Sequence, residues 1–407
     1  MLLEAHSRIN EAKPVKYWYP LSMASYGVEE ILEALDSMCS FRTSMWEKTA
    51  EFERSFAKFQ NCSDAVMVNS GSSADLLLSF LLTSPPSPRL ERGDEILIPA
   101  VTWPTQVWSP IMAGLRVSLV DVDPDTLNIS LTDLERKITD SSRAIFLVHL
   151  LGNPCDMGGI LELAGKHGLI VIEDCCEALG SEWNGVKVGN FGLGAAFSFF
   201  FSHHITTMEG GMITTNDPEL ADRLRILRAH GWLRNVDPSR VPAGDDETDA
   251  RYSFVNWGFN LRPTELQAGF GLQQLAKLPE FTGRRGKLAS RFFSYIDGSR
   301  FLSRPAVSAS GRPVWMALPV LLKECAPFRR HDITAYLESS GIETRPIVAG
   351  NLTRQPAARL FESLRAGSFP GADVVHDRGF YVGLSPFVED AAMDRLIECL
   401  EAFMRRF

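Results

Sequence analysis

The strongest constraint on the fold is a regular alternation of short apolar runs and helical segments between about residues 65 and 216. Seven runs are rich in apolar and β-branched residues: AVMVNS, EILIPA, VSLVDV, RAIFLVHL, LIVIED, AAFSFF and GMITTN. Between them, SSADLLLSFLL, SLTDLERKI and GGILELAGKHG have the apolar spacing of helices. This alternation predicts a mostly parallel sheet covered on both faces. We therefore expect an α/β fold with a seven-stranded sheet in one large domain.

The flanking segments predict how the rest of the chain is organised. Amphipathic helices are expected at residues 28–38, 48–59 and 263–278. Residues 235–254 are polar and rich in Pro, Gly and Asp, which predicts a mobile surface loop or lid. A mixed α/β tail begins at about residue 298. We expect residues 1–275 to hold an N-terminal segment and the large domain, and residues 276–407 a linking helix and a small C-terminal domain.

The composition excludes several classes of function. Of 407 residues, 45% are hydrophobic and 22% are charged, which allows a sizeable buried core. The net charge of -9 is spread along the chain, whereas a nucleic-acid-binding protein normally has a concentrated basic face. No apolar stretch is long enough to span a bilayer. We expect a cytoplasmic protein without nucleic-acid or membrane partners.

The seven cysteines are odd in number and scattered, which is typical of reduced core thiols. Cys175 and Cys176 are adjacent, but no second pair completes a metal-binding spacing. No cysteine lies between Cys176 and Cys325. We therefore predict no metal site.

The segment VNSGSSADLL joins an apolar run to a helix through Gly71, Ser72 and Ser73. Glycine permits a close backbone approach to an anion, and a helix N-terminus with two hydroxyls offers hydrogen-bond donors. The turn is therefore a candidate phosphate site. Helix capping by serine is the more common use of such a motif, and the motif alone favours capping.

Two acids, Glu173 and Asp174, end the apolar run in LIVIEDCCEALG. Ligands of α/β sheets bind at the carboxyl ends of strands. A carboxylate there can hold a pyridine nitrogen protonated, which makes the ring an electron sink. The motif by itself is equally compatible with a solvated pair of acids.

The next run leads into two histidines, His203 and His204, and then into Glu-Gly-Gly. A single histidine is more often structural than catalytic. Here polar groups suited to an anionic cofactor beside a base surround the pair: Ser198, Ser202, Thr206, Thr207, Gly210 and Gly211. This pattern favours a catalytic role for one of the histidines.

The block SFFFSHHITTMEGGMITTND resembles the signature of the DegT/DnrJ/EryC1/StrS family of pyridoxal-phosphate sugar aminotransferases, with His203 at the position of the cofactor-linking lysine. SGSSADLL, PAVTWPTQ, EDCCEALGSEWNG and GFNLRPTELQAGFGLQQL extend the resemblance over nearly the whole chain. It implies the fold-type I aminotransferase-like architecture. One departure is Trp46, near a position where the family usually has glycine in a segment that frames the substrate.

The resemblance also implies roles for individual residues. Asp174 would pair with the pyridine nitrogen, Trp103 would stack on the ring and Glu177 would lie near the ring hydroxyl. Gly71, Ser72, Ser73 and Ser198 would bind the phosphate, Asn260 would reach it from the partner subunit of a homodimer with shared active sites, and His230 and Arg345 would contact the substrate. Without the resemblance, Trp103 could be a core residue, and the turn at Asn260 could simply begin a helix.

Histidine at the lysine position resembles the 3-dehydratase branch of the family. Imidazole can shuttle a proton but cannot link the cofactor covalently, which implies pyridoxamine 5'-phosphate as the working form, converted to pyridoxal 5'-phosphate in the reaction. The expected reaction removes the 3-hydroxyl of a nucleotide-linked 4-keto-6-deoxy hexose, GDP-4-keto-6-deoxymannose by resemblance, in deoxysugar (colitose) biosynthesis. L-Glutamate would restore the amine.

Two alternatives stay open at this stage. One is an aminotransferase that uses a displaced lysine, for which Lys187 is the nearest candidate before the histidines. The other is a cofactor-binding pseudoenzyme. A related histidine-bearing group uses an iron–sulfur cluster held by clustered cysteines, and the gap between Cys176 and Cys325 favours the branch without a cluster.

Overall fold

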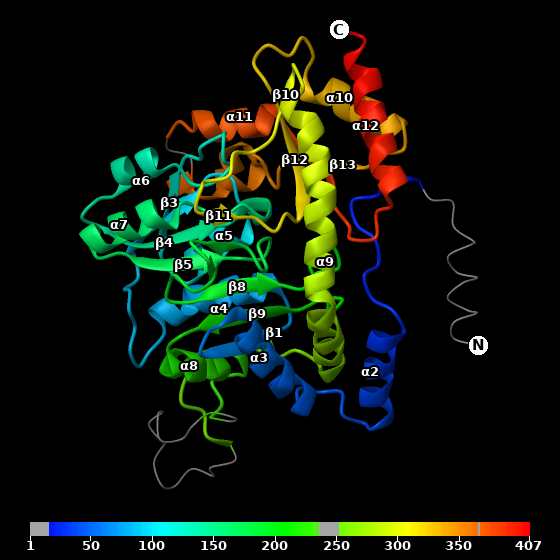
Figure 1. Cartoon of the computed structure of the whole chain (residues 1–407). Coiled ribbons are helices and arrows are strands. Elements are labelled where there is room, and N and C mark those ends of the chain that lie inside the picture. The colour runs from blue at the N-terminus through cyan, green and yellow to red at the C-terminus, as the bar shows by residue number, and fades with distance from the viewer. Residues whose placement is uncertain (1–15, 234–235, 237–251, 365–366) are drawn as a thin grey trace.

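The computed structural model describes residues 16–233, 236, 252–364 and 367–407 (Figure 1). Its main sheet has the strand order β1-β9-β8-β5-β4-β2-β3. The bounds are β1 Asp64–Val68, β2 Glu95–Pro99, β3 Arg116–Val120, β4 Ser142–Val148, β5 Ile170–Asp174, β8 Ala195–Ser198 and β9 Gly211–Thr215. Only β9 runs antiparallel to its neighbours, β1 and β8. The predicted seven-stranded, mostly parallel sheet is confirmed.

Helices cover both faces of this sheet (Figure 1). They are α3 Glu47–Gln60, α4 Gly71–Thr83, α5 Thr105–Met112, α6 Leu131–Lys137, α7 Met157–His167 and α8 Pro218–Arg228. Because successive residues of a strand point to opposite faces, β1 contributes to two cores. Val66 and Val68 pack in the core that contains α4, whereas Ala65 and Met67 pack in the core that contains α3.

A four-stranded antiparallel sheet of order β10-β12-β14-β13 forms a second layer with its own core. Its strands are β10 Leu302–Ser303, β12 Ala317–Leu322, β13 Thr344–Pro346 and β14 Gly379–Gly383, and its helices are α10 Arg330–Ser339, α11 Pro370–Arg378 and α12 Asp390–Met404. Short strands β6 Glu182–Trp183, β7 Val186–Lys187 and β11 Gly311–Arg312 make a third sheet.

The long helix α9, Glu265–Asp297, extends from α3 and α2 (Val28–Cys39), which pack against it, to β10 and β12 of the second sheet (Figure 1). The predicted domain boundary at residue 275 falls inside α9, and the division stays a prediction. The helices expected before the sheet and at residue 263 are present as α2, α3 and α9. Helix α8, absent from the sequence prediction, begins with Asp217 accepting hydrogen bonds from two amides of its first turn.

Most of the predicted lid at residues 235–254 lies outside the described residues. Within the part that the structure describes, no helix is both long and apolar enough to cross a membrane.

Candidate active site

The predicted cofactor residues gather where β5 and β8 end and where α4 begins. Ser198 pairs with Gly211 at the end of β8, and Gly211 also pairs with the last residue of β1. Gly71 lies so close to this edge that an added Cβ would be 2.6 Å from the Ser198 Cβ and 2.9 Å from the Cys176 Sγ. Only glycine fits there without a shift of its neighbours, so the structure explains why a glycine opens this helix.

The serines of the turn divide into two groups. Ser70 caps α4 by accepting a hydrogen bond from the Ser73 amide, and the Ser73 hydroxyl donates to Asn69 Oδ1 at 2.6 Å. The capping interpretation is therefore correct for these residues, and both donors of Ser73 are engaged within the protein. Ser72 is exposed and lies 3.0 Å from the hydroxyl of Thr105, which sequence analysis did not single out. Ser72 and Ser198 remain the predicted phosphate ligands with the freest hydroxyls.

The two strand-end acids have different surroundings. Glu173 is fully buried and accepts hydrogen bonds from the amides of Gly189, Phe191 and Gly192 at 2.7–2.8 Å. Asp174 is also buried and accepts one from the Cys176 amide at 2.9 Å. Neither is the solvated acid that the sequence left possible. Glu173 is fully occupied in bracing a loop, so Asp174 is the acid available to a ligand.

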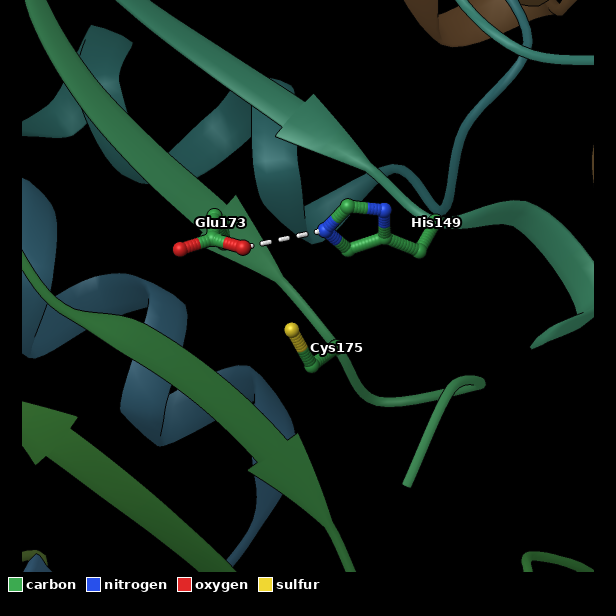
Figure 2. A group of neighbouring side chains, drawn as sticks. All are labelled: His149, Glu173 and Cys175. Atoms are coloured by element: carbon green, nitrogen blue, oxygen red, sulfur yellow. Dashed lines mark hydrogen bonds and ion pairs between the residues drawn. The ribbon is translucent and has the colours of Figure 1, made fainter. Parts of the chain in front are cut away.

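Glu173, His149 and Cys175 form a buried cluster whose possible ligand atoms lie within 4.8 Å of one another (Figure 2). Metal coordination would require free lone pairs, but His149 Nδ1 already accepts a hydrogen bond from the Cys155 amide at 3.0 Å. Its Nε2 therefore carries the hydrogen and donates to Glu173 at 3.1 Å. Burial, with Glu173 nearby, raises the pKa of the Cys175 thiol, which disfavours a thiolate ligand. The hydrogen bonds identify a structural network, not a metal site.

A second acid lies near Asp174. Asp75 of α4 is 2% exposed, and its Oδ1 has no hydrogen-bond partner among the described residues. Burial and the Asp174 carboxyl raise the pKa of Asp75 well above its usual range. Burial also raises the pKa of Asp174, but the Cys176 hydrogen bonds and His149 oppose this. Because only Asp174 accepts an amide hydrogen bond, we assign the charge to Asp174 and the proton to Asp75.

Glu177 lies just after β5 and accepts a hydrogen bond from the Leu151 amide at 2.8 Å. Burial, with a contribution from Asp174, raises the pKa of Glu177 to about 7. Burial raises the pKa of Tyr381, on β14, to about 12, and the nearby Glu177 carboxyl adds to this effect. Arg345 is paired with Tyr381 in the neighbouring strand β13. The second sheet therefore brings Tyr381, which the sequence did not suggest, and Arg345 towards the Glu177 end of the site.

The two histidines after β8 differ in their hydrogen bonds. His204 is buried, and its Nε2 donates to the Val314 carbonyl at 2.8 Å, as expected of a structural histidine. His203 is half-buried, and its Nδ1 is buried without a hydrogen-bond partner among the described residues. Burial lowers the pKa of His203 to about 4, and the Arg285 charge adds to this effect. A hydrogen bond with the Phe200 backbone acts in the opposite direction. At cellular pH His203 is therefore a neutral base.

Lys187, the displaced lysine considered above, lies on β7 in the three-stranded sheet. Its ammonium donates to the Phe59 carbonyl and lies 4.2 Å from the centre of the Phe59 ring. These contacts hold Lys187 against α3, and they oppose its use as the cofactor-linking residue.

Trp103 follows β2 at the same edge of the sheet and is 57% exposed. This exposure excludes the alternative that it is a core residue. A large aromatic face left open at a strand end is available for stacking, which stays the predicted role.

Asn260 precedes α9 and accepts a hydrogen bond from Arg262 at 2.9 Å. It lines a cavity of about 830 Å³ together with Trp46, and no other predicted cofactor residue lines that cavity among the described residues. His230 is exposed just after α8, in a left-handed conformation with φ of 66°. Leu261, the residue after Asn260, accepts a hydrogen bond from the Asn69 amide at 3.1 Å, close to the start of α4. The proposed contact of Asn260 with a partner's cofactor stays a prediction.

The donor set at the strand ends fits a phosphorylated pyridine cofactor. Gly71 leaves a close backbone approach at a helix N-terminus, and Ser72 and Ser198 add hydroxyls. Asp174 offers the carboxylate for a ring nitrogen, and Trp103 offers a stacking face. Together with the sheet order, these residues define a vitamin-B6-dependent enzyme of the aminotransferase-like class.

The chain belongs to the DegT/DnrJ/EryC1/StrS aminotransferase family, whose model matches residues 25–401. It is 37% identical over 369 residues to GDP-4-keto-6-deoxy-D-mannose 3-dehydratase of Yersinia pseudotuberculosis, covering 90% of this chain and 93% of that protein. The solved Escherichia coli GDP-4-keto-6-deoxy-D-mannose-3-dehydratase with bound hydrated PLP is 36% identical, with a TM-score of 0.90 over 94% of this chain and 99% of that one.

A second structure of GDP-4-keto-6-deoxymannose-3-dehydratase holds a trapped PLP-glutamate geminal diamine. It is 35% identical to this chain, with a TM-score of 0.89 and coverage of 94% of this chain and 100% of that one. These similarities support the dehydratase interpretation over the aminotransferase alternative.

Proposed function

We propose that this chain is a pyridoxamine/pyridoxal-phosphate-dependent nucleotide-sugar 3-dehydratase. Its substrate would be a 4-keto-6-deoxy hexose linked to a nucleotide, with GDP-4-keto-6-deoxymannose as the specific candidate, and its product a 3-deoxy-4-keto sugar. The observation that carries the proposal is His203, a neutral imidazole at the end of β8, where this family has its cofactor-linking lysine. Lys187, the lysine considered as its replacement, is held elsewhere by Phe59.

The residues of the site divide the chemical tasks. When bound, the cofactor supplies the amine that condenses with the sugar ketone and a ring that delocalises electrons. Asp174 holds the ring nitrogen protonated, and Trp103 orients the ring. Ser72, Ser198 and the N-terminus of α4 bind the phosphate.

His203 performs the proton transfers. As a neutral imidazole it would take the proton from the 4′ carbon of the bound cofactor. As an imidazolium it would donate that proton to the departing 3-hydroxyl. The C3–O bond breaks, and the oxygen leaves as water with the transferred proton. An imidazole cannot capture the cofactor covalently as a lysine amine does, which favours elimination over completed amination.

Two partners complete the proposal. L-Glutamate would restore the amine, supported by the glutamate adduct in the related dehydratase. A second copy of the chain would supply Asn260 to the cofactor phosphate, supported by the position of Asn260 at a cavity that none of the other predicted cofactor residues lines.

The direct test is incubation of the purified protein with pyridoxamine phosphate, L-glutamate and a panel of GDP-, CDP- and dTDP-linked 4-keto-6-deoxy sugars. We expect ammonia and a sugar product lighter by one oxygen atom, because the 3-hydroxyl is replaced by hydrogen, with the GDP substrate preferred. An aminated sugar that keeps its 3-hydroxyl would instead identify an aminotransferase, and no turnover of any sugar would favour a pseudoenzyme.

A further inference from the structure

Arg285, on α9, is 5% exposed and contacts the turn that carries His203. Its Nη2 donates to the His203 carbonyl at 3.3 Å. Its Nη1 donates to the carbonyls of Met316, at 3.0 Å, and Leu384. The guanidinium therefore connects the catalytic turn with β12 and with the segment after β14.

No carboxylate among the described residues forms an ion pair with this guanidinium, unlike its neighbour Arg284, which pairs with Asp390 at 2.9 Å. Burial lowers the pKa of Arg285 only to about 10, so it stays charged at cellular pH. An unpaired buried charge is costly.

Arg285 and His203 line the same small cavity, together with residues 21–23, Ser25 and residues 384–386. The Arg285 Nε and the His203 Nδ1 are both buried, and neither has a hydrogen-bond partner in the described part of the chain. The cavity volume is about 10 Å³, which leaves room for about one water molecule. The lining segments contain no acidic residue. His204, the other titratable group beside His203, is also a potential cation.

We propose that Arg285 is a positioning residue for the proton transfers of His203. Its buried guanidinium, which no carboxylate of the described residues neutralises, fixes the His203 turn through the carbonyl contact. Together with burial it keeps the imidazole neutral before the reaction, and it makes the imidazolium a stronger proton donor afterwards.

The proposed dehydration, on which this inference rests, needs both properties. A neutral imidazole is required to remove the first proton. Once His203 is protonated, two cations lie together in a nearly water-free space, and their repulsion favours transfer of the proton to the departing hydroxyl. The same residue can then act as base and acid within one turnover.

The test measures the pKa of His203 in the cofactor-loaded enzyme by NMR of ¹³C-labelled histidine, with the His203→Asn variant used to assign the signal. Arg285→Gln should raise the pKa of His203 above about 4 but not to its usual value of about 6.5, because burial, the larger cause of the low pKa, remains. Arg285→Lys, which keeps the charge, should leave the pKa low. Arg284→Gln, which loses a neighbouring link from α9 to the Val388 carbonyl, should not change the pKa of His203.

A second pair of variants avoids loss of the Arg285 contacts. Ser22 lines the cavity, so Ser22→Asp places an acid beside the guanidinium and should raise the pKa of His203 by about one unit. Ser22→Asn is its uncharged control and should have no effect. If Arg285→Gln fails to fold, this pair decides. An unchanged His203 pKa in Ser22→Asp, or in a folded Arg285→Gln, would overturn the proposal.

The NMR measurement needs no sugar, so its outcome is independent of the substrate panel. Where turnover is found, the acidic limb of the pH–rate profile should move upward with the pKa of His203 in the same variants. A purely structural role for Arg285 would lower the rate without moving this limb.

Discussion

Substitution of Gly71 by alanine tests whether the candidate phosphate site (Gly71, Ser72 and Ser198) depends on close contact between α4 and β8. The added Cβ would lie 2.6 Å from the Ser198 Cβ and 2.9 Å from the Cys176 Sγ, closer than real Cβ contacts allow. Overpacking of this kind costs roughly 1–3 kcal/mol of unfolding free energy. The backbone at Gly71 is not left-handed, so the cost arises from these contacts alone.

Gly165→Ala provides the matched control because it adds the same methyl group inside α7, where nothing lies within 4 Å. Alanine in an open helix position should stabilise the protein by about 0.5–1 kcal/mol. Urea unfolding of the apoprotein should therefore separate the two variants by roughly 2 kcal/mol. Because Ser198 must move to admit the new methyl group, we also expect Gly71→Ala to bind pyridoxal phosphate at least roughly tenfold more weakly.

The double variant Gly71→Ala/Ser198→Gly removes the closest clash and should recover part of the lost stability, with a coupling energy of about 0.5–3 kcal/mol. It should not recover cofactor affinity, because the Ser198 hydroxyl is gone. Equal stability and equal cofactor affinity in Gly71→Ala and Gly165→Ala would refute the claim that the candidate phosphate site depends on the close approach at Gly71.

Four further predictions follow from the same site. Borohydride reduction and peptide mapping should find no phosphopyridoxyl-lysine, and an adduct on Lys187 would contradict the histidine mechanism. Mixed dimers of His203→Asn and Asn260→Ala chains should regain activity through one intact site, whereas demonstrated mixed dimers without activity would exclude a shared site. His203→Lys should create a covalent cofactor link, seen by absorbance, and largely abolish water loss; unchanged dehydration would show that this residue does not decide the reaction. Because the pKa of Asp75 is raised on folding, its protonated form stabilises the fold at low pH, and this contribution disappears as pH rises from about 4 through the raised pKa. Urea titrations should show Asp75→Asn losing less stability between pH 5 and pH 8 than the parent protein, and an equal loss would assign the proton elsewhere.

Much of the site could be predicted because strand ends are visible in the sequence. The apolar run that ends at Asp174 and the run that contains Ser198 place both residues near one edge of a parallel sheet, whatever the detailed packing. Gly71 could be recognised in the same way, since a glycine between a strand and a helix indicates close approach. These predictions depend only on local pattern and on the direction of the strands.

The sequence could not assign roles within adjacent pairs. Period-two alternation places Glu173 and Asp174 on opposite faces but does not say which face holds the cofactor. The answer comes from the amides of Gly189, Phe191 and Gly192, which lie beyond the next turn and occupy Glu173 completely. In the same way, the sequence could not say which of His203 and His204 is structural. The Val314 carbonyl, which accepts a hydrogen bond from His204, decides it.

The state of His203 depends on residues that no local pattern connects to it. Arg285 is 82 positions away, and it reaches the His203 carbonyl only because α9 extends from α2 and α3 to the second sheet. The sequence identifies an imidazole with an ordinary pKa near 6.5, which would be partly protonated below neutral pH. The fold adds burial and an unneutralised guanidinium, and both favour the neutral base. A change from lysine to histidine therefore explains why the cofactor is not captured, while the acid–base strength of that histidine is a property of the tertiary structure.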